Sequence, residues 1–211
     1  AIPRAGAFKT SSSAFLRCGD ADRGMASPGK IAPGMCASLR RVHLQPLAID
    51  GVYRATPRTK GARRFDWFRT DALAPVLPPS WNPAIGTTYT ALAGQVEGLH
   101  CERGHRVVTC VSGRVVLVVV DVRVGAPTFG RWIPIDLDTV NRVTVIIPPD
   151  TAWGFQAFTG EAALSSLHEE AANGIRIHPE DTDLAIAWPL AVGGAAGTPL
   201  AEILDLLPEV P

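Results

Sequence analysis

His100 is the residue with the clearest capacity for proton transfer, and reactive side chains surround it in the sequence. Cys101, Glu102 and His105 follow it within five positions. An imidazole titrates near neutral pH, so it can remove a proton from a substrate and return one. Histidine, cysteine and glutamate also bind zinc, so the same cluster is compatible with a metal site. A lone histidine is more often a core residue satisfied by a nearby carboxylate, so the residue types alone do not decide between these roles.

Two further pairs of candidate residues lie at strand spacing. Ser166 and His168 are two positions apart, so their side chains share one face of a strand. No turn motif of a serine nucleophile surrounds Ser166, which favours a strand surface, but an inward face would make His168 a candidate proton donor. Trp153 and Phe155 also share a face. Such a pair is usually core, and it also offers an apolar wall for a ligand ring.

Composition places these residues in one folded domain and excludes several function classes. The chain has 211 residues, 46% hydrophobic and 19% charged, which is enough apolar material for a core. The 20 basic and 20 acidic residues cancel, which argues against a binder of nucleic acid or of an acidic membrane. The longest apolar run, Val115–Val120, is too short to span a bilayer. Four cysteines without metal or disulfide spacing favour a reducing cytoplasm.

Short Val- and Ile-rich runs separated by turn residues predict a β-protein. One of them, Val116–Val120, is apolar at every position, which predicts burial on both faces. Strands at this spacing favour an antiparallel sandwich or barrel. Pro199–Leu207 begins with proline and repeats Leu and Ile at helical spacing, which predicts a short C-terminal helix. The predicted strands are Arg106–Val111, Arg114–Val124, Arg131–Leu137, Arg142–Ile147, Trp153–Phe158 and Ala162–Leu167.

Several sequence blocks occur in an order that resembles the dTDP-4-dehydrorhamnose 3,5-epimerase family, particularly its actinobacterial members that make antibiotic deoxysugars. The resemblance covers roughly residues 42–189. The most specific blocks are the long glycine-containing segment after the central strand and the tryptophan-proline ending. The blocks include Gly98-Leu-His100, Val108-Thr-Cys-Val-Ser-Gly113, Val119-Val-Asp-Val-Arg-Val-Gly-Ala-Pro-Thr-Phe-Gly-Arg131, Gly174-Ile-Arg176 and Asp183-Leu-Ala-Ile-Ala-Trp-Pro189.

The resemblance implies an all-β, cupin-like double-stranded β-helix (jelly roll) with a short C-terminal helix. It also implies a small-molecule substrate, no cofactor, and a homodimer that exchanges N-terminal strands. The chain then divides into an N-terminal extension or arm (1–44), an RmlC-like jelly-roll domain (45–190) and a C-terminal loop and helix (191–211). Metal-binding cupins usually supply a second histidine from a later strand, where this chain has Trp153. A metal at His100 is therefore disfavoured.

The family's reaction moves protons beside the ketone of a 4-keto sugar carried on a nucleoside diphosphate. The carbanion delocalises onto oxygen, so a base can remove a proton from one face and an acid can return one to the other. The resemblance assigns the base to His100 and the carboxylate that orients it to Asp181. Arg106 matches a family lysine near the developing enolate oxygen and keeps the positive charge in a planar fork.

Other site positions depart from the family pattern. Glu97 replaces an arginine that faces the substrate phosphates, and its negative charge would repel a diphosphate. Ser166 aligns with the family's acid tyrosine but has neither its reach nor a suitable pKa. Trp153 replaces a histidine and makes that wall apolar. The losses concentrate on nucleotide binding and the proton donor, while the scaffold strands are kept, and a fold alone does not fix a function.

Three functions are compatible with this pattern, in the following order. The first is a diverged epimerase-like enzyme of natural-product biosynthesis, whose His100–Asp181 base isomerises, epimerises or cyclises a carbonyl compound that carries no nucleotide. The second is a genuine 3- or 3,5-epimerase of a dTDP-4-keto-6-deoxyhexose. The third is a non-catalytic binding protein on the same fold. Glu97 and Ser166 favour the first over the second by a narrow margin.

Overall fold

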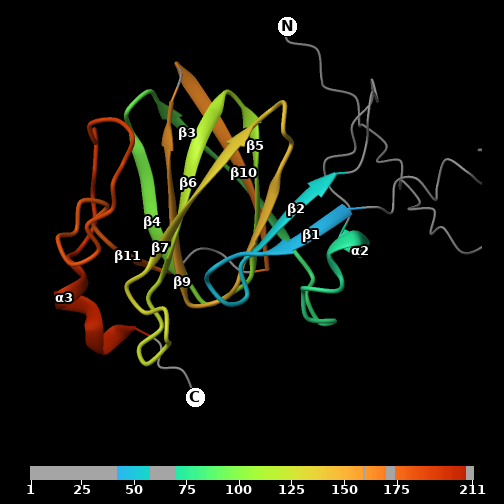
Figure 1. Cartoon of the computed structure of the whole chain (residues 1–211), viewed down its shortest axis with the longest axis horizontal. Coiled ribbons are helices and arrows are strands. Elements are labelled where there is room, and N and C mark those ends of the chain that lie inside the picture. The colour runs from blue at the N-terminus through green and yellow to red at the C-terminus, as the bar shows by residue number, and fades with distance from the viewer. Residues whose placement is uncertain (1–41, 58–69, 159, 170–173, 208–211) are drawn as a thin grey trace, which may run out of the picture.

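The computed structural model describes residues 42–57, 70–158, 160–169 and 174–207, so most of the predicted N-terminal arm lies outside the described residues. These residues form two antiparallel sheets that face each other as a jelly roll (Figure 1). The six-stranded sheet has the order β1 (Val42–Pro46), β2 (Tyr53–Pro57), β8 (Thr144–Ile147), β5 (Arg106–Ser112), β10 (Glu161–His168) and β3 (Ile85–Leu92). The five-stranded sheet has the order β11 (Ile175–Arg176), β4 (Val96–Glu102), β9 (Thr151–Ala157), β6 (Arg114–Asp121) and β7 (Trp132–Asp138).

Strand β6 shows why its sequence is apolar at consecutive positions. Val115, Leu117 and Val119 point into the core between the two sheets. The alternate residues Val116 and Val118 point to the opposite face and join a second apolar cluster. Both faces of the strand are therefore buried, as predicted.

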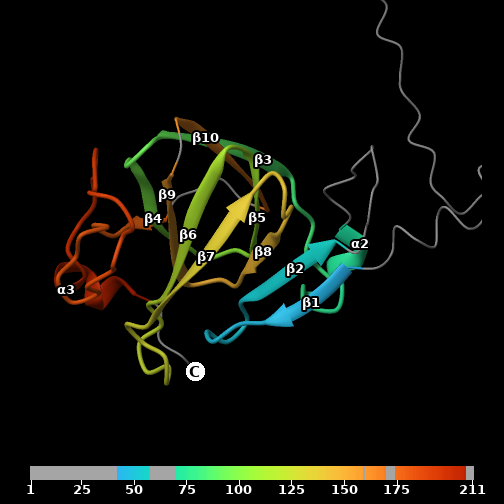
Figure 2. The same ribbon diagram turned by 45° about the horizontal axis from the view of Figure 1, so that its top comes forward.

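The outer face of each sheet is covered by a different segment. Helix α3 (Leu200–Ile203) and the 3-10 turn η1 (Leu204–Leu206) belong to the segment that packs on the five-stranded sheet. Helix α2 (Thr70–Leu73) and the loop after it bring Leu73 and Leu77 onto the six-stranded sheet. The β1–β2 hairpin and α3 lie on opposite sides of the barrel in both views (Figures 1 and 2).

The predicted all-β fold is confirmed, and the predicted strands are confirmed to within a few residues at their ends. The largest end difference is at β6, which stops at Asp121 and not at Val124. The predicted C-terminal helix is divided into α3 and η1. Strands β1, β2, β3, β4 and β11 were not among the predicted runs, and β1 crosses the expected boundary at residue 44.

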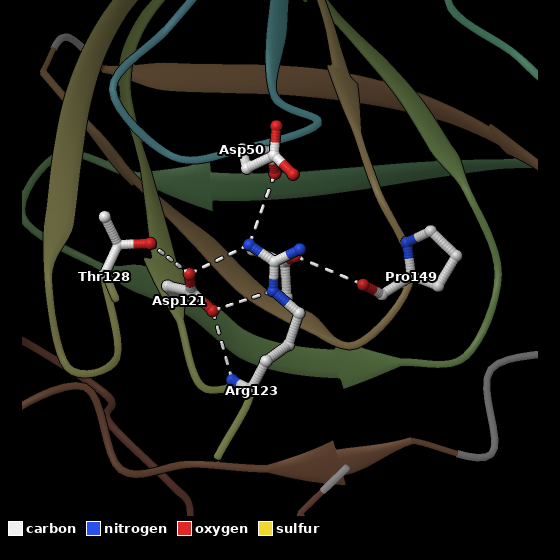
Figure 3. A network of polar contacts seen from close by, with 6 residues as sticks. Asp50, Asp121, Arg123, Thr128 and Pro149 are labelled. Carbon is white, nitrogen blue, oxygen red and sulfur yellow. Dashed lines mark hydrogen bonds and ion pairs between the residues drawn. The ribbon is translucent and has the colours of Figure 1, made fainter. Parts of the chain in front are cut away.

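A polar network, here called the Asp121 clamp (Asp121, Arg123 and Thr128), ends β6 (Figure 3). Asp121 is fully buried, and its carboxylate accepts hydrogen bonds from the backbone amide of Arg123 (3.1 Å), from the Arg123 guanidinium (2.9 Å) and from the Thr128 hydroxyl. Arg123 also donates to the backbone carbonyl of Asp50 at 3.3 Å, in the turn after β1. The backbone amide of Arg123 donates to the Asp121 carboxylate and so makes no hydrogen bond to a neighbouring strand, which is why β6 ends at Asp121.

None of the helices in the described ranges is both long and apolar enough to span a membrane.

Candidate active site

His100 lies on β4 and points into the barrel, where two aromatic rings contact it. Its backbone is paired with Trp153 on β9, and the two ring centroids are 5.2 Å apart. Tyr89, from β3 in the other sheet, lies 5.5 Å from His100 and 5.5 Å from Trp153, meeting the indole edge-on. We call these three residues the ring cluster. It joins the two sheets at the edge where β3 leads into β4.

Gly98 explains how β4 can bring His100 to this position. The register between β4 and β9 shifts between Glu97 and His100, and Gly98 has a φ of 112°. A Cβ at Gly98 would lie 2.6 Å from the Cα of Gly154, so only glycine allows the two backbones to approach this closely. The bulge therefore requires a glycine at position 98, two residues before His100.

The charged neighbour of His100 is Glu97. Its Oε1 lies 3.1 Å from Nε2 of His100 and 2.8 Å from Nη2 of Arg176 on β11. Burial lowers the pKa of His100, and the nearby Glu97 carboxylate opposes this effect. The imidazole is therefore neutral at pH 7, as a proton acceptor must be. Arg176 balances the charge of Glu97, which is consequently not a lone anion beside the site.

A buried ion pair between Glu102 and Arg106 lies at the same end of the barrel. Arg106 is 3% exposed and Glu102 6%, and Nε of Arg106 contacts Oε2 of Glu102. The Trp153 indole also bonds the Glu102 carboxylate, whereas Nη1 of Arg106 has no hydrogen-bond partner among the described residues. Burial raises the pKa of Glu102 and lowers that of Arg106, and each effect is opposed by the partner's charge. Arg106 thus keeps a buried N–H group for another acceptor.

A cavity of about 770 Å³ opens beside this pair, and its lining includes Glu102, Arg106 and His168. His168 and Ser166 are both buried in β10, and His168 Nε2 lies 2.9 Å from the Thr87 hydroxyl. The Ser166 hydroxyl is buried and, within the described part of the chain, has no hydrogen-bond partner. The expected shared face of Ser166 and His168 is consistent with this placement, and Ser166 is no surface residue.

Asp181 has a different position from the one its expected role requires. Its two carboxylate oxygens accept hydrogen bonds from the backbone amides of Asp183 (2.9 Å), Leu184 (3.1 Å) and Leu200 (2.7 Å). These bonds close the loop before α3 onto the five-stranded sheet. The carboxylate that contacts His100 is Glu97, so the geometry does not support the predicted His100–Asp181 pair.

The remaining predicted residues divide between the ring cluster and the core. Trp153 contacts His100 directly, whereas Phe155 is fully buried among the core side chains. Sequence reasoning did not identify Tyr89 or Arg176 as site residues. The spacing of two between Thr87, Tyr89 and Ala91 could have placed Tyr89 on one face of a strand. Because β3 is not among the predicted strands, the sequence alone does not place Tyr89 in the barrel.

Within the described residues, no group of three or more His, Cys, Asp or Glu side chains is arranged to hold a metal ion. The inner walls of the antiparallel jelly roll carry a neutral imidazole, a phenol and a buried guanidinium, groups that are able to take part in acid–base chemistry. The fold is that of a cupin-like protein. The chain belongs to the dTDP-4-dehydrorhamnose 3,5-epimerase family, whose sequence model matches residues 46–203.

Relatives of known name and structure agree with this assignment. The chain is 36% identical over 174 residues to a dTDP-4-dehydrorhamnose 3-epimerase of Streptomyces niveus, covering 78% of this chain and 81% of the relative. It is 33% identical to the dTDP-4-dehydrorhamnose 3,5-epimerase of Mycobacterium tuberculosis, covering 71% of this chain and 79% of the relative.

Solved structures give the same result. NovW, a 4-keto-6-deoxy sugar epimerase from the novobiocin biosynthetic gene cluster of Streptomyces spheroides, superposes with a TM-score of 0.73 at 31% identity, covering 89% of this chain and 98% of NovW. ChmJ, a 3'-monoepimerase from Streptomyces bikiniensis in complex with dTDP-quinovose, superposes with a TM-score of 0.71 at 28% identity, covering 78% of this chain and 92% of ChmJ. The predicted family and the cupin-like jelly roll are confirmed.

Proposed function

We propose that this chain is an epimerase of a dTDP-4-keto-6-deoxyhexose in the biosynthesis of a natural-product sugar. This is the second of the three functions considered from the sequence, and the named relatives favour it over a substrate without a nucleotide. The observation that carries the proposal is the buried, neutral His100 held in the ring cluster, close enough to Arg106 for the guanidinium charge to act on the imidazole.

In this mechanism His100 removes the proton beside the ketone. The electron pair moves onto the ketone oxygen, and the Nη1 group of Arg106 donates a hydrogen bond to the enolate that forms. Arg106 is a suitable donor because its position is fixed by Glu102 and one N–H group is unbonded among the described residues. The wall formed by Trp153 excludes water from the base, since its side chain is fully buried.

Glu97 is compatible with a diphosphate substrate because Arg176 accompanies it. The Arg176 guanidinium is 43% exposed while it contacts Glu97 at 2.8 Å. An exposed arginine can bind a phosphate without first leaving a buried site, and arginine suits phosphate geometry. We therefore propose that Arg176 binds the diphosphate of the substrate. The sequence alone indicates only the repulsion between the diphosphate and Glu97.

A homodimer is part of the same proposal. β1 is the edge strand of the six-stranded sheet, so its outer backbone groups are available to another chain. The burial pattern of β1 leaves His43 exposed on this hairpin. Sedimentation analysis at micromolar concentration is expected to give twice the mass of one chain. A single-chain mass would contradict the dimer without affecting the proposed reaction.

The reaction is tested by incubating the protein with dTDP-4-keto-6-deoxyglucose in deuterium oxide and following the protons beside the ketone by NMR. We expect enzyme-dependent deuterium at C3 or at both C3 and C5, lost in His100→Ala and kept in the control His178→Ala, whose ring accepts a hydrogen bond from the backbone amide of Glu180 in the loop after β11. The carbon that exchanges distinguishes a 3-epimerase from a 3,5-epimerase. Exchange no faster than in buffer would contradict the proposal and favour a carbonyl substrate without a nucleotide.

A further inference from the structure

We propose that Tyr89 is the proton donor of the epimerisation, acting together with His100 as the base. The inference rests on the proposed function, because inversion at carbon needs an acid as well as a base. Ser166, the residue at the position where the family resemblance places an acid, is an alcohol, and an alcohol is a far weaker acid than a phenol. The barrel therefore needs a donor from another strand.

The position of Tyr89 fits this role. It lies on β3 in the six-stranded sheet, whereas His100 lies on β4 in the five-stranded sheet. The two side chains therefore approach the same space from different walls, as inversion requires. Their ring centroids are 5.5 Å apart. Tyr89 is partly buried and packs against the core, so its ring is held while part of it remains accessible.

Neighbouring residues fix the ring and favour its protonated form. The edge-on contact with Trp153, at 5.5 Å and 83° between ring planes, limits rotation of the phenol. Burial raises the pKa of Tyr89, and the carboxylate of Glu102 raises it further. The phenol consequently carries its proton at neutral pH. The pKa of His100 is lowered in the same cluster, so base and acid are separated in the direction that catalysis requires.

Two other proton donors in this part of the barrel fit less well. The His168 ring is already engaged, because its Nε2 lies 2.9 Å from the Thr87 hydroxyl. Cys101 belongs to the apolar cluster on the outer side of the five-stranded sheet, and burial raises the pKa of its thiol to about 12. Tyr89, by contrast, brings a phenol from β3 in the six-stranded sheet into contact with the His100 ring on β4.

The proton balance of the step is complete without an added reactant. His100 takes the proton as the C–H bond breaks, and the electron pair passes to the ketone oxygen. A new C–H bond then forms on the other face as the enolate collapses and takes the proton of Tyr89. The phenolate regains a proton from water, and the imidazolium returns its own to water, which restores both groups.

The test compares Tyr89→Phe with the matched control Tyr53→Phe, because the chain has two tyrosines and Tyr53 lies on β2, outside the site. Both are assayed with dTDP-4-keto-6-deoxyglucose in deuterium oxide. We expect Tyr89→Phe to lose inversion by about 10²-fold or more, while His100 still exchanges the proton on its own face. The control is expected to invert at the wild-type rate.

The outcomes separate this inference from the proposed function. Inversion by Tyr89→Phe within twofold of wild type would overturn the donor assignment while leaving the epimerase intact. Loss of exchange and inversion together in a folded Tyr89→Phe protein would also overturn it, since the ring would then serve the base. Absence of exchange in wild type would remove both proposals.

A second measurement applies if Tyr89→Phe does not fold. Expression of the Tyr53→Phe variant in medium containing 3-fluorotyrosine places the label at Tyr89 alone, because the chain has two tyrosines. Fluorination lowers the pKa of a phenol without removing its hydroxyl. If Tyr89 must be protonated, the alkaline fall in kcat/KM shifts to lower pH in the labelled protein. An unchanged alkaline limb would overturn the assignment.

Discussion

Two carboxylate–arginine pairs in this barrel have a buried carboxylate, and they differ in how completely their polar atoms are bonded. In the Asp121 clamp, Arg123 and Thr128 bond both carboxylate oxygens. Burial alone would raise the pKa of Asp121, but these hydrogen bonds hold it below its usual value. In the second pair, Arg106 Nη1 has no hydrogen-bond partner among the described residues, and burial raises the pKa of Glu102.

The difference indicates which pair stabilises the fold and which serves a ligand. A buried polar atom without a partner costs about 1–3 kcal/mol, so a fold retains one where binding later satisfies it. The clamp ties the end of β6 to the turn after β1 and leaves Arg123 with no role in the cavity lining. We infer that the clamp contributes stability and that Arg106 contributes catalysis. Three substitutions test this division: His100→Ala, Arg106→Met and Arg123→Met.

The largest effect is expected for His100→Ala. Removing the base is expected to lower kcat by about 10³-fold, because general base catalysis typically contributes 10²–10⁴-fold. Some loss of stability is also expected, since the imidazole packs against Tyr89 and Trp153, so kcat is measured on the folded protein. Steady-state kinetics and urea unfolding measure the two quantities, with His178→Ala, in the loop after β11, as the control. Retention of more than a tenth of the wild-type turnover would contradict the role of His100.

Arg106→Met is expected to lower kcat by roughly 10²-fold, the effect of removing one donor to a developing oxyanion. Its cost in stability is expected to be small, because Glu102 already has a raised pKa and can take up a proton when its partner is lost. Kinetics with urea unfolding tests both statements. A variant that is strongly destabilised but has normal kcat would assign Arg106 to the fold and reverse the comparison.

Arg123→Met is expected to have the opposite pattern. It leaves the fully buried Asp121 without its cation, which is expected to cost roughly 3 kcal/mol in the free energy of unfolding. The folded protein is expected to keep its kcat, since the clamp is separate from the ring cluster. Urea unfolding at pH 7 gives the first quantity, and kinetics well below the melting temperature give the second. A large loss of kcat without destabilisation would contradict the division.

The same variant changes how stability depends on pH. Asp121 has a folded pKa below its usual value of 3.8, so its contribution is present above that value and is lost as the pH falls through the lower folded pKa. Without Arg123 the folded pKa rises, and the loss on acidification begins at higher pH. Unfolding curves between pH 6 and pH 3 for both proteins measure this shift, and parallel curves would rule it out.

The scaffold could be predicted from the sequence, and strands β3 and β4 could not. Runs such as Val116–Val120 carry an unbroken apolar signal because both faces are buried. β3 alternates threonine with tyrosine and glycine and is half-exposed, so its signal is weak. β4 contains Gly98 and a register shift that interrupts the period of two. The strands that bear Tyr89 and His100 are thus the ones least visible in the sequence.

The site was predicted where a motif fixes a residue on the scaffold and missed where two segments meet in space. His100 and Arg106 follow from their blocks, and the structure brings both to the same end of the barrel. Contacts between Glu97 and Arg176 join residues 79 positions apart, which no local pattern records. The His100–Asp181 pair was likewise expected only from the family resemblance, because no local pattern shows whether the two side chains meet. A substitution at Asp181 tests it directly.

Asp181→Asn separates an orienting carboxylate from a structural one. The amide loses part of the capacity to accept the three backbone N–H groups, so we expect a cost of about 1–3 kcal/mol in the free energy of unfolding. We expect the turnover rate of the folded protein to stay within about threefold of wild type, because Asp181 acts on the loop before α3. If the turnover rate instead fell by about 10²-fold at unchanged stability, the His100–Asp181 pair would be restored.

Glu97→Gln has the smallest expected effect, and it tests whether Glu97 is the carboxylate that sets the charge of His100. The Glu97 carboxylate stabilises the imidazolium, so it holds the pKa of His100 higher than burial alone would. Its removal is therefore expected to lower that pKa. Because the base must be neutral, the acidic limb of kcat/KM then moves to lower pH, while the plateau rate changes little. Arg176→Gln is the matched variant: it removes a cation that lowers the pKa of His100, so the limb moves to higher pH. If the acidic limbs of both variants shifted in the same direction, or did not shift, the charges of Glu97 and Arg176 would not be what sets the pKa of His100.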